Sequence, residues 1–310
     1  RGRADKWERV TWDEAYALIK SKFDAIKAES GAKSVVFHLG TGRGTAPYMT
    51  RLQYAFGSVQ YAYMLSGNSC YVPRVAACNV LMGTYCVPDC SQNHFDRYEH
   101  EGWVPPKNIF VWGNNPLVSN ADGNLGHWVV DCMKRGSKLI MVDPRVNWLA
   151  TRADQVLQII PGTDGALCLA ILNVLINEDL IDNEFVDKWC YGFDELAERV
   201  QEYTPEFAAE TCGITADEIR VCARKLGFDG EHHWSLLMGV AVDQNPNGCQ
   251  VTQCLIAMAA ITGNLDVPGG TVVGVQMQFE MTGATDFMSD ELKNKCIGWD
   301  TYPIVKVLLN

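Results

Sequence analysis

Cys70 is the side chain best suited to chemistry in this sequence, because of its neighbours. It ends a run of small and polar residues, Ser66-Gly67-Asn68-Ser69-Cys70, and a short helix is expected over residues 74–81. A thiol near a helix N-terminus has its thiolate form stabilised by the helix dipole. The sequence therefore indicates a reactive cysteine, and the competing interpretation is a buried thiol in a turn.

Three short loops place glycines and polar side chains where a ligand could bind. They are Gly113-Asn114-Asn115-Pro116, Asp143-Pro144-Arg145 and Pro161-Gly162-Thr163-Asp164-Gly165. Each loop follows an apolar run, at residues 109–112, 139–142 and 156–160. Such runs are typical of strands buried on both faces of a parallel sheet. We therefore expect the loops at these strand ends to face a ligand.

A helix between the first two strands completes a strand–helix–strand unit. Its apolar side chains recur at helical spacing, at Leu125, Trp128, Val129, Cys132 and Met133. Lys134 and Arg135 occupy the last turn, where positive charge is favourable, and Gly136 can end the helix. The stretch from residue 107 to residue 166 is thus predicted to form the centre of the fold.

A second glycine-rich turn, Gly40-Thr41-Gly42-Arg43-Gly44, lies between an expected strand at residues 34–39 and a helix that continues through Tyr54. Strand, glycine turn and helix in this order can bind phosphate on backbone N–H groups. The spacing is GxGxG rather than GxGxxG, and no acidic residue follows about 20 residues later. A plain tight turn and a cofactor-facing loop are equally good interpretations.

Other helices are expected on both sides of this centre. A capping box at Thr11 and Glu14 starts a helix that continues to about Glu29. Its apolar stripe, expected to point inward, is Ala15, Leu18, Ile19, Phe23 and Ile26. Further helices are predicted at residues 164–176, 182–190, 193–201, 205–211, 215–226 and 247–261, with a strand at residues 234–238.

Composition limits the class of protein. The 310 residues carry a formal net charge of −11, which argues against nucleic-acid binding because that requires a basic surface. No apolar run approaches the ~20 residues of a membrane span. The twelve cysteines include no CxxC pair, so most are interpreted as buried thiols in a reducing or anaerobic setting. A metal site formed by His94 and His100 is a weak alternative.

The motifs in this order resemble the molybdopterin-dependent oxidoreductases of the dimethyl sulfoxide reductase type, from residue 1 to about residue 273. The similar segments are Trp12-Asp13-Glu14-Ala15, Trp112-Gly113-Asn114-Asn115-Pro116, Val142-Asp143-Pro144-Arg145, Ala153-Asp154, Pro161-Gly162-Thr163-Asp164-Gly165, Gly239 with Gln244, Thr262-Gly263-Asn264-Leu265 and Pro268-Gly269-Gly270. Each segment alone is weak evidence, whereas their order and spacing together are specific.

The resemblance implies a bis-molybdopterin guanine dinucleotide cofactor carrying molybdenum or tungsten. It implies that Cys70 is the protein ligand to the metal, and a thiolate suits a metal already bound by sulfur. It implies that the dinucleotide is bound by Gly113, Asn114, Asn115, Asp143, Arg145, Gly162, Asp164, Gly239 and Gln244. Asp143 would bind the ribose or nearby polar groups, and Asp164 would accept N–H bonds from guanine. The alternative for Asp164 is an N-terminal helix cap.

The sequence departs from the family pattern at both ends. The family begins with a four-cysteine segment for an iron–sulfur cluster and ends with a β-rich domain, and neither is present. We therefore expect a central fragment, with the 4Fe-4S cluster in a missing N-terminal part. As a fragment it could be inactive and bind the dinucleotide poorly. No signal peptide is visible, so a cytoplasmic and an exported location both stay open.

We predict an α/β fold in which a Rossmann-like parallel-sheet domain, residues 107–235, is inserted in a second α/β lobe, residues 1–106 and 236–310. The predicted function is the catalytic-subunit core of an anaerobic oxidoreductase that acts on a small molecule and transfers electrons through an iron–sulfur partner subunit. The alternative is a non-catalytic electron-transfer or structural subunit that keeps the fold without metal. A nicotinamide dehydrogenase is less consistent, because GxGxxG is missing. Substrate, metal, direction of reaction and oligomeric state are not determined by the sequence.

Overall fold

The computed structural model describes residues 7–39, 45–58, 60–63, 70–90, 95–119, 124–231, 234–273 and 289–290. The chain divides into two compact units, Arg1–Leu65 with Gln278–Asn310, and Ser66–Met277. The glycine-rich turn at residues 40–44 lies outside the described residues. The lobe boundaries expected at residues 106/107 and 235/236 stay a prediction.

The first unit contains two helices and a pair of short parallel strands. Its elements are α1 (Trp12–Ser30), β1 (Phe37–Leu39), α2 (Ala46–Phe56) and β2 (Tyr61–Tyr63), with β1 and β2 paired from Phe37 opposite Tyr61. The predicted capping box starts α1: the Thr11 backbone N–H donates to Glu14 Oε2 at 2.7 Å, and the Glu14 N–H donates to Thr11 Oγ1. The first predicted helix is therefore confirmed.

The predicted inward stripe of α1 is wrong for most of its members. Within the described part of the chain, α1 buries none of its residues, and Leu18 and Ile19 are 61% and 51% exposed. Phe23 is the exception, because its ring packs edge-on against Phe37 and Phe56 with centroids 6.2 and 5.2 Å away. The periodicity identified the helix correctly, but only one position of the stripe meets β1 and α2.

A four-stranded parallel sheet forms the centre of the second unit. Its strands are β4 (Asn108–Trp112), β5 (Lys138–Val142), β6 (Gln155–Leu157) and β7 (Trp234–Met238), in the order β6-β5-β4-β7. Every residue of β4 and β7 is buried, which explains why both sequences are apolar except for Asn108 and Ser235. The strand β6 ends earlier than predicted, and beyond it the Ile160 N–H donates to the Cys212 carbonyl instead of a neighbouring strand.

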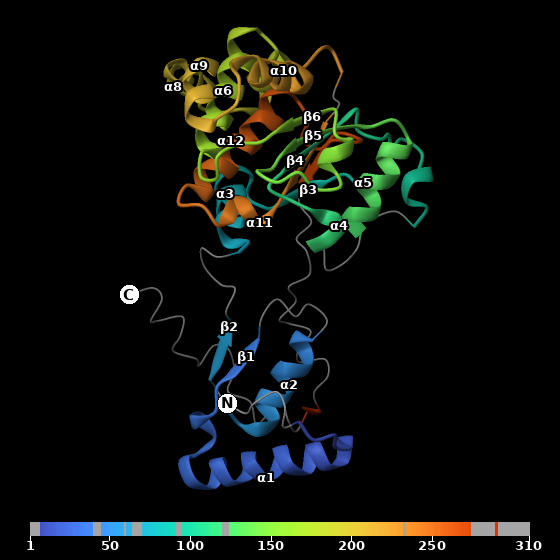
Figure 1. The fold of residues 1–310 in the computed structure, drawn as a ribbon, viewed down its shortest axis with the longest axis vertical. Helices are drawn as coiled ribbons and strands as arrows, with labels where there is room; N and C mark the ends of the chain where they lie inside the picture. The colour runs from blue at the N-terminus through green and yellow to red at the C-terminus, as the bar shows by residue number, and fades with distance from the viewer. Residues whose placement is uncertain are drawn as a thin grey trace. The chain divides into compact units, whose positions relative to one another are not determined.

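Helices cover both faces of this sheet (Figure 1). Alternate strand residues Ile109 and Val111 pack with Trp128 of α5 (Asn124–Lys134), whose predicted stripe is confirmed. Phe110 and Trp112 point to the opposite face, into a larger core that includes α6 (Asp164–Asn177), α10 (Ala216–Leu226) and α12 (Gly248–Ile261). The predicted α/β fold with a parallel sheet is therefore confirmed, and a doubly covered sheet leaves its strand ends available for a site.

The remaining elements surround this core. They are α3 (Val72–Met82), β3 (Cys86–Pro88), α4 (Pro116–Ser119), α7 (Asn183–Trp189), α8 (Phe193–Arg199), α9 (Pro205–Cys212), α11 (Val240–Asp243) and β8 (Thr271–Val273), with β3 and β8 antiparallel. In the part of the chain that the structure describes, no helix has the length and apolarity needed to cross a bilayer.

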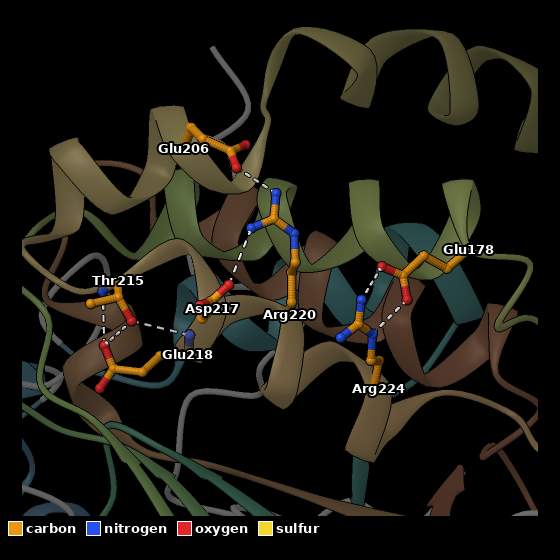
Figure 2. A network of polar contacts seen from close by, with 7 residues as sticks. All are labelled: Glu178, Glu206, Thr215, Asp217, Glu218, Arg220 and Arg224. Atoms are coloured by element: carbon orange, nitrogen blue, oxygen red, sulfur yellow. Dashed lines mark hydrogen bonds and ion pairs between the residues drawn. The ribbon is translucent and has the colours of Figure 1, made fainter.

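Ion pairs on the exposed side of α10 tie the helical layer together (Figure 2). Arg224 binds Glu178 through two hydrogen bonds of 2.7 and 2.8 Å, and Arg220 pairs with Glu206 of α9. A second capping box, Thr215 with Glu218, begins α10. The two ion pairs therefore join α10 to α9 and to the end of α6, within the helical layer that covers the sheet.

Candidate functional site

A cleft of about 380 Å³ opens where the parallel strands end. Loops that follow all four strands line it: Gly113 after β4, Val142 and Pro144 around the end of β5, Ile159, Pro161, Gly162 and Asp164 after β6, and Ala241, Gln244, Asn245 and Pro246 after β7. Ligands of open parallel sheets bind at this edge. Four of the predicted residues, Gly113, Gly162, Asp164 and Gln244, therefore line one cleft.

Two glycines allow the loops after β4 and β7 to touch. A Cβ on Gly239 would lie 2.5 Å from the carbonyl carbon of Gly113 and 2.6 Å from Asn114 Cα. Gly113 has a φ of +59° and would itself bring a Cβ to 2.8 Å from Ala241 Cβ. The Asn114 side chain adds a bond of 3.1 Å to the Met238 carbonyl. These contacts bring the loop of Gly113, which lines the cleft, directly against the loop after β7.

Asp164 has a fixed orientation in the cleft. Its Oδ1 accepts the indole N–H of Trp112 at 2.7 Å, and its Oδ2 accepts the side-chain amide of Asn245 at 3.0 Å. It is the first residue of α6, whose cap is Thr163, so the interpretation of Asp164 as a helix cap is wrong. Each carboxylate oxygen has two lone pairs, so both retain capacity for a ligand N–H group.

Asp143 and Arg145 follow β5 at the same sheet edge. Asp143 Oδ1 accepts the Arg145 backbone N–H at 2.8 Å, and Oδ2 accepts the Asn147 side-chain amide at 3.1 Å. The residues on each side of Asp143 line the cleft, while Arg145 is exposed. Asn115 lies after β4, where its carbonyl accepts N–H groups of α4.

Cys70 precedes α3 in an unusual turn. The Val72 N–H donates to the Cys70 carbonyl at 2.8 Å, and Tyr71 between them has φ 69° and ψ −43°. These angles are close to a classic γ-turn, which is rare and strained. A non-glycine residue in such a conformation costs on the order of 1–3 kcal/mol and persists only where its surroundings hold it. The thiol is half-buried.

A buried ion pair lies next to this turn. Asp243 of α11 accepts the Tyr71 N–H at 2.8 Å, the Arg74 N–H at 3.1 Å and the Arg74 Nε–H at 2.8 Å. Arg74 also donates to the Met238 carbonyl at 3.0 Å. Burial alone would lower the pKa of Arg74, but Tyr85 and Asp243 outweigh it and the pKa is raised. The Arg74 guanidinium is therefore charged at neutral pH.

The loop after β7 connects the turn of Cys70 to the cleft. Its residues Ala241 and Gln244 line the cleft, while Asp243 holds the backbone beside Cys70. The weak alternative of a histidine metal site receives no support from His100, whose Nδ1 lies 3.1 Å from Asp96. His94 lies outside the described residues. In the described part of the chain, no three His, Cys, Asp or Glu side chains gather as a metal-binding group.

The sequence did not reveal the residues that orient the predicted site residues. Trp112 and Asn245 orient Asp164, Asn147 orients Asp143, and Arg74 with Asp243 holds the turn of Cys70. Arg74 is the one charged residue in the sequence of α3, which is a signal that could have revealed it.

Comparison with known proteins identifies the family. The model of the molybdopterin oxidoreductase family matches residues 1–296. The chain belongs to the molybdopterin oxidoreductase family. The resemblance inferred from the sequence motifs is thereby confirmed. The relatives of this family are enzymes, a hydratase among them.

Two relatives and one solved structure illustrate the similarity. Acetylene hydratase of Syntrophotalea acetylenica is 31% identical over 309 residues, which cover 97% of this chain and 39% of that protein. The molybdopterin-containing thiosulfate reductase subunit PhsA of Salmonella typhimurium is 28% identical over 265 residues, covering 86% and 33%. The structure of acetylene hydratase from Pelobacter acetylenicus matches with a TM-score of 0.64 at 30% identity, covering 96% of this chain and 39% of that one. This member of the family thus spans a third to two fifths of its relatives.

Proposed function

We propose that this chain is the core of the catalytic subunit of a molybdenum or tungsten oxidoreductase. The cleft would bind the guanine dinucleotide end of a molybdopterin cofactor, and Cys70 would bind the metal. One observation carries the proposal: the loop at residues 239–246 both lines the cleft and holds the turn of Cys70. A cofactor bound in the cleft would extend along this loop toward Cys70.

The cleft wall fits the nucleotide part of such a cofactor. Gly113 lines the cleft without a side chain of its own, and the close contact of Gly239 with the loop after β4 fixes this part of the wall. The cleft volume of about 380 Å³ lies in the range of small-molecule sites.

Asp164 fits recognition of a base with adjacent N–H groups. Guanine presents its ring N–H and amino group side by side, and a carboxylate can accept both in a charge-assisted contact. Trp112 and Asn245 hold the carboxylate from the protein side, so little ordering is required when the base binds. Asp143 is similarly held by Asn147 and could accept ribose hydroxyl groups.

Cys70 fits the role of a metal ligand. A thiolate is a soft donor, and the half-buried thiol stands in a turn held by Asp243. When bound, the cofactor supplies the redox chemistry at its metal. The residues of this chain would bind and orient it and limit the access of water to the metal.

A small-molecule substrate and an iron–sulfur electron-transfer subunit complete the proposal. The relative PhsA is named as the molybdopterin-containing subunit of a reductase, which supports the existence of partner subunits here. A 4Fe-4S cluster in the longer protein would carry electrons between the metal and the partner.

Metal analysis of the full-length protein, purified without oxygen, tests this function. We expect molybdenum or tungsten bound to the protein and reversible reduction of an artificial electron carrier with a suitable substrate. A protein that contains neither metal, although it is folded and was produced with both available, would contradict the proposal. That result would favour the non-catalytic subunit of the same fold.

A further inference from the structure

The ion pair between Arg74 and Asp243 has no assigned role, although it touches both halves of the proposed site. We propose that Asp243, oriented by Arg74, is a positioning residue that fixes the direction of the Cys70 thiol toward the cofactor. This inference rests on the proposed function of Cys70 as a metal ligand. The pair would act through the backbone and does not itself touch the cofactor.

The hydrogen bonds of Asp243 join it directly to the turn of Cys70 and to the first turn of α3. Its carboxylate accepts the N–H of Tyr71, the residue directly after Cys70 and the one with the strained backbone. It also accepts the backbone N–H of Arg74 at 3.1 Å, so it holds the first turn of α3 at two points. A γ-turn conformation at a non-glycine residue requires such an external restraint.

Arg74 orients this carboxylate. Its Nε donates to Asp243 Oδ2 at 2.8 Å, while Nη1 donates to the Met238 carbonyl at the end of β7. The side chain of Asp243 is 0% exposed and that of Arg74 is 10% exposed, so water contributes little to holding either. The guanidinium thus links the sheet edge, the loop after β7 and the turn of Cys70.

The location of the pair favours a role in positioning over general stabilisation. Replacing a buried ion pair by apolar residues is often neutral for stability. This pair joins two segments 169 residues apart in sequence, and each segment carries a part of the proposed site. The comparison pair is Arg224 with Glu178 on the helical layer (Figure 2), and neither residue lines the cleft.

The experiment compares six variants of the full-length holoenzyme: Asp243→Asn, Arg74→Met, their double variant, Arg74→Lys, Cys70→Ala, and Arg224→Met as control. Two readouts are used: hydrogen–deuterium exchange of the segment from Cys70 to Val75, and the electron paramagnetic resonance spectrum of the metal. Asp243→Asn should accelerate exchange at Tyr71 and Arg74 by about 10–100-fold, because a hydrogen bond to a charged acceptor is lost. The metal spectrum should change in the same variant.

The double variant separates positioning from stability. With both charges removed, most of the thermal stability lost in each single variant should return. The metal spectrum should stay altered, because the carboxylate that held the turn is absent. Arg74→Lys should restore the spectrum in part, since lysine keeps the charge but cannot make both guanidinium bonds. Arg224→Met should leave exchange and spectrum unchanged.

Different outcomes identify which claim fails. If Cys70→Ala alters the metal spectrum but Asp243→Asn and the double variant do not, the positioning role is refuted and the proposed function stands. If wild-type protein holds no metal, or Cys70→Ala leaves its spectrum unchanged, the proposed function itself fails. If the spectrum recovers together with stability in the double variant, the pair is structural only and the inference is overturned.

Discussion

Gly239→Ala should disrupt the site through a single methyl group. The backbone of Gly239 has φ −109° and ψ 174°, so alanine itself can adopt this conformation without strain. The obstacle is the loop after β4: the new Cβ would overlap the Gly113 carbonyl oxygen, its nearest atom, and would lie 2.5 Å from the carbonyl carbon, whereas ordinary contact begins at about 3.4 Å. The contact with the carbonyl carbon alone requires the two loops to separate by about 0.9 Å, and the contact with the oxygen requires more.

The expected cost follows from this displacement. Overpacking against a well-packed neighbour typically costs about 1–3 kcal/mol, and the neighbour here is backbone, so we expect about 3 kcal/mol. For a unit of this size that corresponds to a fall in Tm of roughly 6–12 °C. A separation of nearly 1 Å between two walls of the cleft should also reduce the bound metal and any activity by on the order of 100-fold.

The assay combines thermal unfolding with metal analysis, and Gly165→Ala is the matched control. Gly165 lies in the first turn of α6 beside the same cleft, and a Cβ there would meet nothing within 4 Å. Alanine at this position should leave metal content unchanged and raise stability by about 0.5–1 kcal/mol. A Gly239→Ala variant that matches Gly165→Ala in both Tm and metal content would refute the close contact of the two loops.

Three further predictions test individual residues. Cys70→Ala should lower activity by more than about 100-fold while Tm changes little, and retained activity would show that this thiol does not bind the metal. Asp164→Asn should raise the Kd of guanosine diphosphate for cofactor-free protein by about 10–100-fold, as measured by calorimetry with adenosine diphosphate as control; an unchanged Kd would rule out a contact with the base. The hydrogen bond from Arg224 lowers the pKa of Glu178 in the folded protein. The charged carboxylate therefore stabilises the fold fully above its unfolded pKa of about 4.3, and this stabilisation is lost as the pH falls through the lower pKa of the folded state. Glu178→Gln should therefore reduce the urea midpoint at pH 7 and have almost no effect near pH 3, and an equal effect at both values would contradict this origin.

The sheet and its helices could be predicted from the sequence because their burial leaves a direct pattern. All five residues of β4 are buried, so its apolar run has no polar interruption inside the core. The α5 stripe recurs with helical spacing because that face meets the sheet. The loops could be located for the same reason, since they simply follow the strands.

The contacts inside the site could not be predicted, because they join residues far apart in the chain. Nothing near Asp243 indicates that it binds Arg74, and Trp112 gives no local sign that its indole N–H reaches Asp164. The error in α1 has a related cause. An apolar stripe shows which face of a helix can be buried, but its partner is determined by tertiary packing that the stripe does not specify.

The nucleotide released by acid denaturation of the full-length protein, purified without oxygen, tests the central claim most directly. Chromatography of the released material should yield guanosine monophosphate together with molybdenum or tungsten, because Asp164 and the loops after β4 and β7 form the proposed guanine dinucleotide site. Release of a different nucleotide with the metal, or of neither nucleotide nor metal, would contradict the account.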